Sequence, residues 1–169
     1  MKKIQNVLQV LRQRYLAKGM VDFGNPEDTL IATLLSARTR DEQVLKVYPG
    51  FRKAFPTLTH LARADVKDIA ANISSIGLYR NKAKAIKALA DRIMSIYGGR
   101  VPSTMDELLT LPGVGRKTAS CVLWYGFGKA AMAVDTHVFR IAHRLGWAKG
   151  KTPEVVEKEL MAIVPQKLW

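Results

Sequence analysis

The stretch Leu111-Pro112-Gly113-Val114-Gly115-Arg116-Lys117-Thr118-Ala119 is the most informative part of the sequence, because two predicted helices meet in it at a glycine-rich turn. A dinucleotide-binding glycine loop needs a strand before it, and residues 105–109 have helical spacing instead. A P-loop needs four residues between its first glycine and the Gly-Lys pair, and this stretch lacks that spacing. Glycines let backbone N–H groups approach a phosphate at the start of the second helix. The stretch therefore predicts a helix-hairpin-helix motif, which binds DNA without reading its sequence.

The rest of the chain has apolar residues at three- and four-residue spacing and no sustained alternation of apolar and polar residues. We therefore predict an all-α protein of about ten helices, over residues 4–15, 26–35, 39–48, 57–64, 65–73, 81–96, 105–109, 116–125, 136–145 and 154–163. We expect one helix to begin with Asn25 as its N-cap and Pro26 as its first residue, and another to begin with a capping box of Thr39 and Glu42. Expected ends are Gly19, Pro49-Gly50 and Gly98-Gly99.

Composition narrows the class of protein. The chain has 169 residues, 48% of them hydrophobic and 24% charged, which suits one compact domain or two small lobes. Its 27 lysines and arginines against 14 acids give a net charge of +13, typical of a protein that binds a polyanion, although solvated helix faces have the same composition. A single cysteine, Cys121, excludes an internal disulfide and favours a reducing compartment. No apolar run is long enough to predict a membrane span.

Lys117 and Asp135 are the candidate catalytic residues. Lys117 follows the hairpin turn, where its amine is either a nucleophile or a plain phosphate contact. Asp135, eighteen residues later, precedes a predicted helix and is either an N-cap or a functional carboxylate. An amine nucleophile together with a carboxylate is what attack at a nucleotide C1′ requires, because the carboxylate stabilises a cationic sugar and moves protons.

Four segments carry a resemblance to a known family: LPGVGRKTA and AVDTHVFRIAHRLGW, with LLSARTRDEQ and IGLYRNKA. From about residue 31 to residue 169 the chain resembles the endonuclease III family of helix-hairpin-helix DNA glycosylase/AP lyases. The resemblance implies two helical lobes that flank a DNA-binding cleft, with the damaged nucleotide flipped into it. Residues 19–129 are expected to form a six-helix barrel lobe with a wedge loop and the hairpin. Residues 1–18 and 130–169 are expected to form a second lobe, C-terminally incomplete.

The resemblance also assigns roles to individual residues. Lys117 matches the Schiff-base nucleophile and Asp135 the catalytic carboxylate, whereas Leu78 matches a wedge that enters the base stack, its alternative being a core leucine. Arg38 stands where the bacterial prototype has a glutamine opposite the wedge, and is expected to fill the void and bind the orphan base. The other expected DNA contacts are Leu111, Pro112, Gly113, Val114, Gly115 and Arg116 of the hairpin, Lys82 and His137.

The family continues with a four-cysteine loop that holds a 4Fe–4S cluster, and this chain departs from that pattern. Cys121 lies in the second helix of the hairpin and matches no cluster ligand. We therefore expect no cofactor and no metal ion to bind this chain, and we expect the lobe that carries Asp135 to be less stable without the missing segment.

These observations favour a base-excision-repair glycosylase that removes oxidised pyrimidines from duplex DNA and then nicks the abasic site by β-elimination through Lys117. One alternative is a mismatch glycosylase acting on thymine or adenine, although Lys117 argues against the adenine-specific branch. Another is an inactive, truncated DNA-binding module. The expected partner is duplex DNA with damaged bases or abasic sites. A monomer is expected, in the cytoplasm at the nucleoid of a prokaryote or in the nucleus of a eukaryote. Trp124, Tyr125 and Trp147 are expected to be core residues.

Overall fold

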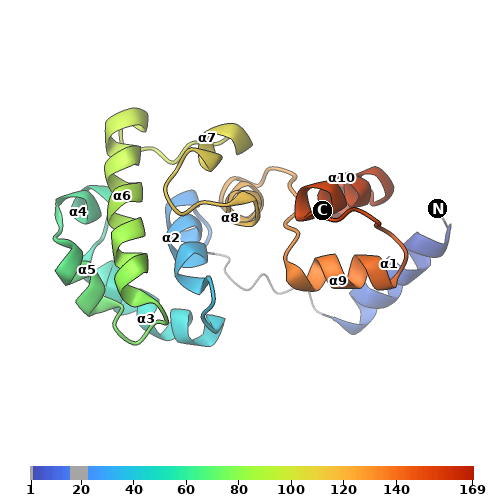
Figure 1. The fold of residues 1–169 in the computed structure, drawn as a ribbon, viewed down its shortest axis with the longest axis horizontal. Helices are drawn as coiled ribbons and strands as arrows, with labels where there is room; N and C mark the ends of the chain where they lie inside the picture. The colour runs from blue at the N-terminus through green and yellow to red at the C-terminus, as the bar shows by residue number, and fades with distance from the viewer. Residues whose placement is uncertain (1, 16–22) are drawn as a thin grey trace.

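A computed structural model describes residues 2–15 and 23–169, and in these residues it has ten α-helices and no strand (Figure 1). The all-α prediction is therefore confirmed for the described part of the chain. The predicted stop at Gly19 lies outside the described residues. The helices are α1 Lys2–Arg14, α2 Pro26–Ser36, α3 Asp41–Ala54, α4 Leu58–Arg63, α5 Val66–Asn72, α6 Tyr79–Tyr97, α7 Met105–Leu109, α8 Arg116–Cys121, α9 Thr136–Arg144 and α10 Pro153–Ile163. None of these helices is long and apolar enough to cross a bilayer.

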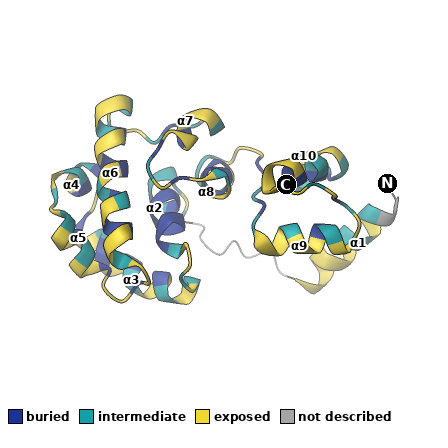
Figure 2. Ribbon diagram, viewed as in Figure 1, coloured by how far each residue is buried: buried dark blue, intermediate teal, exposed yellow. Residues whose placement is uncertain are grey.

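The helices pack around two hydrophobic clusters. The larger, which we call the large core, includes Leu30, Leu35, Phe51, Ile69 and Ile86, and joins α2 to α8. The small core is formed by Met132, Val134, Ala142, Ala148, Val156, Leu160 and Val164, and Leu8 of α1 packs against it. Figure 1 shows α1, α9 and α10 grouped apart from the other helices, so the first helix lies with the last ones. Buried faces of α2 and α6 meet in the large core (Figure 2).

Local signals placed several helix boundaries correctly. The side chain of Asn25 accepts a hydrogen bond from the amide of Asp28 at 2.8 Å, with Pro26 as the first residue of α2. Gly98 ends α6 with a φ of 58°, in the left-handed region that favours glycine. Both boundaries are determined by interactions within four residues, which is why the sequence alone was enough to find them.

Helix α3 differs from the prediction at both ends. Its N-cap is Arg40, without a side-chain cap, so the predicted capping box of Thr39 and Glu42 is wrong. The Thr39 hydroxyl instead accepts a hydrogen bond from the Lys82 ammonium at 2.6 Å. The helix also continues through Pro49 to Ala54. Burial of aromatic residues on the same face, chiefly Tyr48 and Phe51, outweighs the cost of about 3 kcal/mol that an internal proline brings.

A π-helical turn, η1 Val122–Gly126, follows α8, where the sequence predicts an uninterrupted α-helix over 116–125. Gly126 lies so close to α2 that a Cβ atom there would be 2.7 Å from Cα of Pro26. The close approach excludes larger residues and holds the end of α8 against α2. Trp124 of this turn is 36% exposed, so the prediction that it belongs to the core is wrong.

Candidate functional site

The hairpin joins α7 to α8 as the motif predicts. Leu111 and Val114 are buried in the large core, and the Val114 amide donates to the Leu111 carbonyl at 3.1 Å. Gly113 has a φ of 77°, and a Cβ atom there would lie 3.3 Å from Leu34 Cδ1. Leu111 and Val114 therefore anchor the turn, whereas Gly113, Gly115 and Lys117 are exposed at its surface.

Lys117 and Asp135 line the same cavity, of about 190 Å³, although they come from different helices. Lys117 is in the first turn of α8, and Asp135 is the N-cap of α9. The cavity thus lies where the hairpin of the large core meets the start of α9 in the small core. Its full lining is Thr33, Ser36, Asp41, Lys117, Cys121, Tyr125, Ala133, Asp135 and Val138.

Asp135 is an N-cap, as one reading of the sequence proposed, and it also lines the cavity. Its Oδ1 accepts hydrogen bonds from the amides of His137 at 2.9 Å and Val138 at 2.8 Å. Within the described part of the chain, no hydrogen bond reaches Oδ2. The cap therefore orients the carboxyl group while using one oxygen, and the two readings of this residue are compatible.

Cys121, one helical turn after Lys117, contributes its thiol to the cavity wall. Burial raises the pKa of this thiol; the Lys117 charge acts to lower it and the Asp135 carboxylate to raise it further. The Cys121 thiol thus stays neutral and sits within the electrostatic reach of both candidate catalytic groups. Sequence reasoning assigned Cys121 no place in the site.

Four further cavity residues were missed as functional residues in the sequence: Thr33, Ser36, Asp41 and Tyr125. They add hydroxyl and carboxyl groups to the lining of the cavity. No motif in one sequence marks them, because their place depends on how α2, α3 and η1 pack against α8 and α9.

Leu78 and Arg38 lie on two neighbouring loops, before α6 and after α2. Leu78 is 55% exposed, so its alternative interpretation as a core leucine is wrong. Both residues have a positive φ, 55° for Arg38 and 60° for Leu78, and both line a second cavity, of about 300 Å³, with Gly113 of the hairpin. The structure therefore brings the two loops and the hairpin turn together on one face.

Two predicted DNA contacts are engaged inside the protein. Arg116 forms a bidentate ion pair with Glu157 of α10, with Nε–Oε2 at 2.6 Å and Nη2–Oε1 at 3.0 Å. Lys82 is 6% exposed, and its ammonium donates to the carbonyl of Leu35 and the hydroxyl of Thr39. Lys82 is therefore enclosed by its acceptors, whereas the Arg116 side chain stays 33% exposed beside its ion pair, and the roles of both as DNA contacts stay predictions. His137, by contrast, is exposed beside the cavity on α9.

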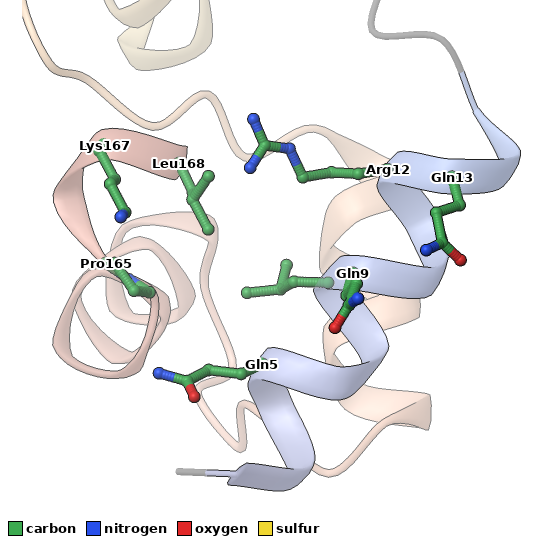
Figure 3. A pocket seen from close by; sticks show the side chains of 8 residues that line it. Gln5, Gln9, Arg12, Gln13, Pro165, Lys167 and Leu168 are labelled. Carbon is green, nitrogen blue, oxygen red and sulfur yellow. The ribbon is translucent and has the colours of Figure 1, made fainter.

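A larger cavity, of about 430 Å³, lies between α1 and the C-terminal turn (Figure 3). It is lined by Gln5, Leu8, Gln9, Arg12, Gln13, Pro165, Lys167 and Leu168. Its charged residues, Arg12 and Lys167, are both cationic, and it includes no acid or hydroxyl that would form a catalytic pair. The smaller cavity with Lys117 and Asp135 is therefore the candidate active site.

The residues present do not fit a 4Fe–4S cluster. Cys121 is the single cysteine of the sequence and lines the candidate active site. Among the residues that the structure describes, no three His, Cys, Asp or Glu side chains are placed to hold a metal ion.

Comparison with known proteins agrees with this geometry. Residues 31–166 match the model of the HhH-GPD superfamily of base excision DNA repair proteins. Endonuclease III of Thermotoga maritima is 48% identical over 145 residues, which cover 86% of this chain and 68% of that protein. A solved structure of a trapped endonuclease III–DNA covalent intermediate superposes with a TM-score of 0.93 at 39% identity, covering 99% of this chain and 80% of the other. A thermostable thymine-DNA glycosylase is less similar, with a TM-score of 0.70 at 28% identity over 85% of this chain and 75% of the other.

Proposed function

The chain belongs to the endonuclease III family within the HhH-GPD superfamily of base excision DNA repair proteins, and on this premise we propose that it removes oxidised pyrimidines from duplex DNA. It is a DNA glycosylase and AP lyase. The observation that carries the proposal is the cavity in which Lys117 and Asp135 face one space from two different helices. A nucleophile and a carboxylate that line one small cavity can together cleave an N-glycosidic bond.

The proposed reaction begins when the Lys117 amine attacks C1′ of the flipped nucleotide. The C1′–N bond breaks, and its electron pair leaves with the base, which takes up a proton. Asp135 stabilises the positive charge that develops on the sugar and accepts the proton that the Lys117 nitrogen loses. The C1′–O4′ bond then breaks, O4′ takes up the proton held by Asp135, and the lone pair of the Lys117 nitrogen forms the C=N bond of a protonated Schiff base.

The strand is cut from this Schiff base. Loss of a proton from C2′ pushes electrons toward the imine, and the C3′–O bond breaks with the phosphate as leaving group. Water then hydrolyses the imine and regenerates the Lys117 amine. These steps require no external oxidant or reductant.

The proposed partner is duplex DNA containing damaged bases or abasic sites, bound by a monomer. Support comes from the net charge of +13 and from the face on which Arg38, Leu78 and the hairpin turn meet. We propose that Leu78 enters the base stack and Arg38 fills the space left by the flipped base. The site of action is then where the chromosome lies, the nucleoid of a prokaryote or the nucleus of a eukaryote.

The test is borohydride trapping, because borohydride reduces a Schiff base to a stable crosslink. The protein is incubated with a thymine glycol duplex and with an abasic duplex, beside Lys117→Ala. Lys158→Ala, which removes an exposed lysine from α10, is the matched control. We expect crosslinks to both duplexes with the wild-type chain and with Lys158→Ala, and none with Lys117→Ala.

Two other results would contradict parts of the proposal. Crosslinking to the abasic duplex alone would retain the lyase and overturn oxidised-pyrimidine excision; a thymine mismatch duplex then tests the other glycosylase branch. A folded protein that binds DNA but crosslinks to neither duplex would be the inactive DNA-binding module. We also propose that the chain binds no iron–sulfur cluster, so the active preparation should contain no stoichiometric iron or labile sulfide.

A further inference from the structure

Lys82, in the first turns of α6, is a buried lysine with a neutral set of partners. It is 6% exposed, and its Nζ donates to the Leu35 carbonyl and to Thr39 Oγ1, both at 2.6 Å. Within the described residues no carboxylate forms an ion pair with it. Burial lowers the pKa of this ammonium. Because a buried charge is costly, an apolar side chain of the same length would fill this space at lower cost unless the two hydrogen bonds serve a purpose.

Both acceptors belong to the segment that carries Arg38. Leu35 is in the last turn of α2, where carbonyl groups lack partners within the helix, and Thr39 lies in the turn just after Arg38. The donor lies four residues after Leu78. The Lys82 ammonium therefore joins the loop of Arg38 to the helix that presents Leu78.

The two loops are also in direct contact and share an unusual backbone conformation. A Cβ atom on Gly77 would lie 3.5 Å from Thr39 Oγ1 and 3.6 Å from the Arg38 carbonyl oxygen. Arg38 and Leu78 each have a left-handed φ, which costs a non-glycine residue about 1 kcal/mol or more. Such conformations persist only where the surroundings hold them. The two hydrogen bonds of Lys82 reach the segment around Arg38, and an exposed hydrogen bond from Gln43 Nε2 to Ser75 Oγ at 3.0 Å joins α3 to the loop before Leu78.

We propose that Lys82 is a positioning residue that holds Arg38 and Leu78 as one preformed unit for insertion into duplex DNA. This inference rests on the proposed function, since it concerns the residues that replace the flipped nucleotide. The charge of Lys82 is used within the protein, to satisfy two acceptors in a fixed direction, and not on a phosphate. Preformed loops do not have to be ordered when DNA binds, so the gain is in the insertion step.

The test separates insertion from chemistry by using two abasic substrates. In a duplex, the loops must enter the stack and fill the space opposite the orphan base. In a short single strand with an abasic site there is no duplex stack to fill, and the Schiff base forms by the same chemistry. We compare borohydride-trapping rates on both substrates for the wild-type chain, Lys82→Met and Thr39→Val. Thr39→Ser is the conservative variant, since it retains the hydroxyl.

The expected result is a selective defect. Lys82→Met should lower the duplex rate about tenfold or more, as for loss of hydrogen bonds from a charged donor, and leave the single-strand rate within about twofold of wild type. Thr39→Val should have a smaller effect in the same direction, and Thr39→Ser should restore the wild-type rate. The double variant Lys82→Met/Thr39→Val should crosslink the duplex no more slowly than Lys82→Met alone, because both substitutions remove the same hydrogen bond between Lys82 and Thr39. Lys84→Met, an exposed neighbour on α6, is the matched control and should leave the ratio of the two rates unchanged.

Three outcomes would overturn the inference while wild type still crosslinks. One is an unchanged duplex rate in Lys82→Met; another is an equal loss on both substrates. The third concerns the slope of log DNA affinity against log salt concentration. If Lys82→Met decreases the magnitude of this slope by about one relative to wild type, Lys82 is a phosphate contact. If Lys82→Met does not fold, Thr39→Val decides by the same criteria. Failure of wild type to crosslink to either substrate would instead contradict the proposed function.

Discussion

At the scale of single residues, Asp135 combines a structural and a chemical role, and substitution can separate them. Asparagine is as good an N-cap as aspartate, so Asp135→Asn should leave the free energy of unfolding within about 0.5 kcal/mol of wild type. It removes the negative charge, so excision of the damaged base should slow by about a hundredfold or more. Chemical denaturation and single-turnover excision measure the two effects.

Asp135→Ala is the comparison, because it removes both the cap and the charge. It should lose about 1 kcal/mol of stability in addition to activity. Excision at the wild-type rate by Asp135→Asn would show that the carboxylate is only a cap.

At the scale of elements, Tyr48 of α3 holds α2 and α3 together in a way that depends on pH. Its hydroxyl donates to Asp28 Oδ1 at 2.7 Å, and its ring packs 4.5 Å from that of Phe23. Burial raises the pKa of Tyr48 far above its ordinary 10.0, and the hydrogen bond to Asp28 and the charge of that carboxylate raise it further. The neutral phenol therefore stabilises the fold fully below pH 10, and this contribution is lost as the pH rises above 10.

Urea unfolding at pH 8 and at pH 10.5 measures this contribution. Tyr48→Phe should cost about 1.5 kcal/mol at pH 8, as for loss of a hydrogen bond to a charged group. It should also make stability fall less steeply between the two pH values. Tyr97→Phe, on a partly exposed tyrosine of α6, is the control and should retain the wild-type pH dependence. Equal slopes for Tyr48→Phe and wild type would exclude Tyr48 as the group responsible.

At the scale of the whole molecule, the ion pair of Arg116 and Glu157 joins the two hydrophobic cores beside the active site. Arg116 precedes Lys117 on α8, whereas Glu157 is on α10 with only 5% of its surface exposed. Arg116→Met leaves this carboxylate buried without its partner. It should cost about 2 kcal/mol, less than for a fully buried pair because the Arg116 side chain is one-third exposed.

Arg116→Met should also lower the rate of borohydride trapping on both thymine glycol and abasic duplexes, because Lys117 lies on a helix of the large core and Asp135 caps a helix of the small core, and this ion pair joins the two cores. The double variant Arg116→Met/Glu157→Leu removes the unpaired charge and should recover most of the stability. A loss of DNA affinity alone, with a smaller salt slope and unchanged stability, would instead identify Arg116 as the phosphate contact first expected from the sequence.

Features that depend on neighbours along the chain could be predicted from the sequence: the all-helical architecture, the cap at Asn25, the end of α6 at Gly98 and the hairpin turn. The hairpin motif and the segment around Asp135 also identified two of the residues that line the cavity, Lys117 and Asp135, although the sequence left two interpretations of each residue open. The partners of the long cationic side chains, by contrast, depend on the tertiary structure. Lys82 and Arg116 are cationic, as phosphate contacts are. The carbonyl that Lys82 binds lies 47 residues away in the sequence, and the carboxylate that Arg116 binds lies 41 residues away. Hydrogen bonds and ion pairs of this kind depend on which elements pack together, and that packing cannot be predicted from a local pattern of charge.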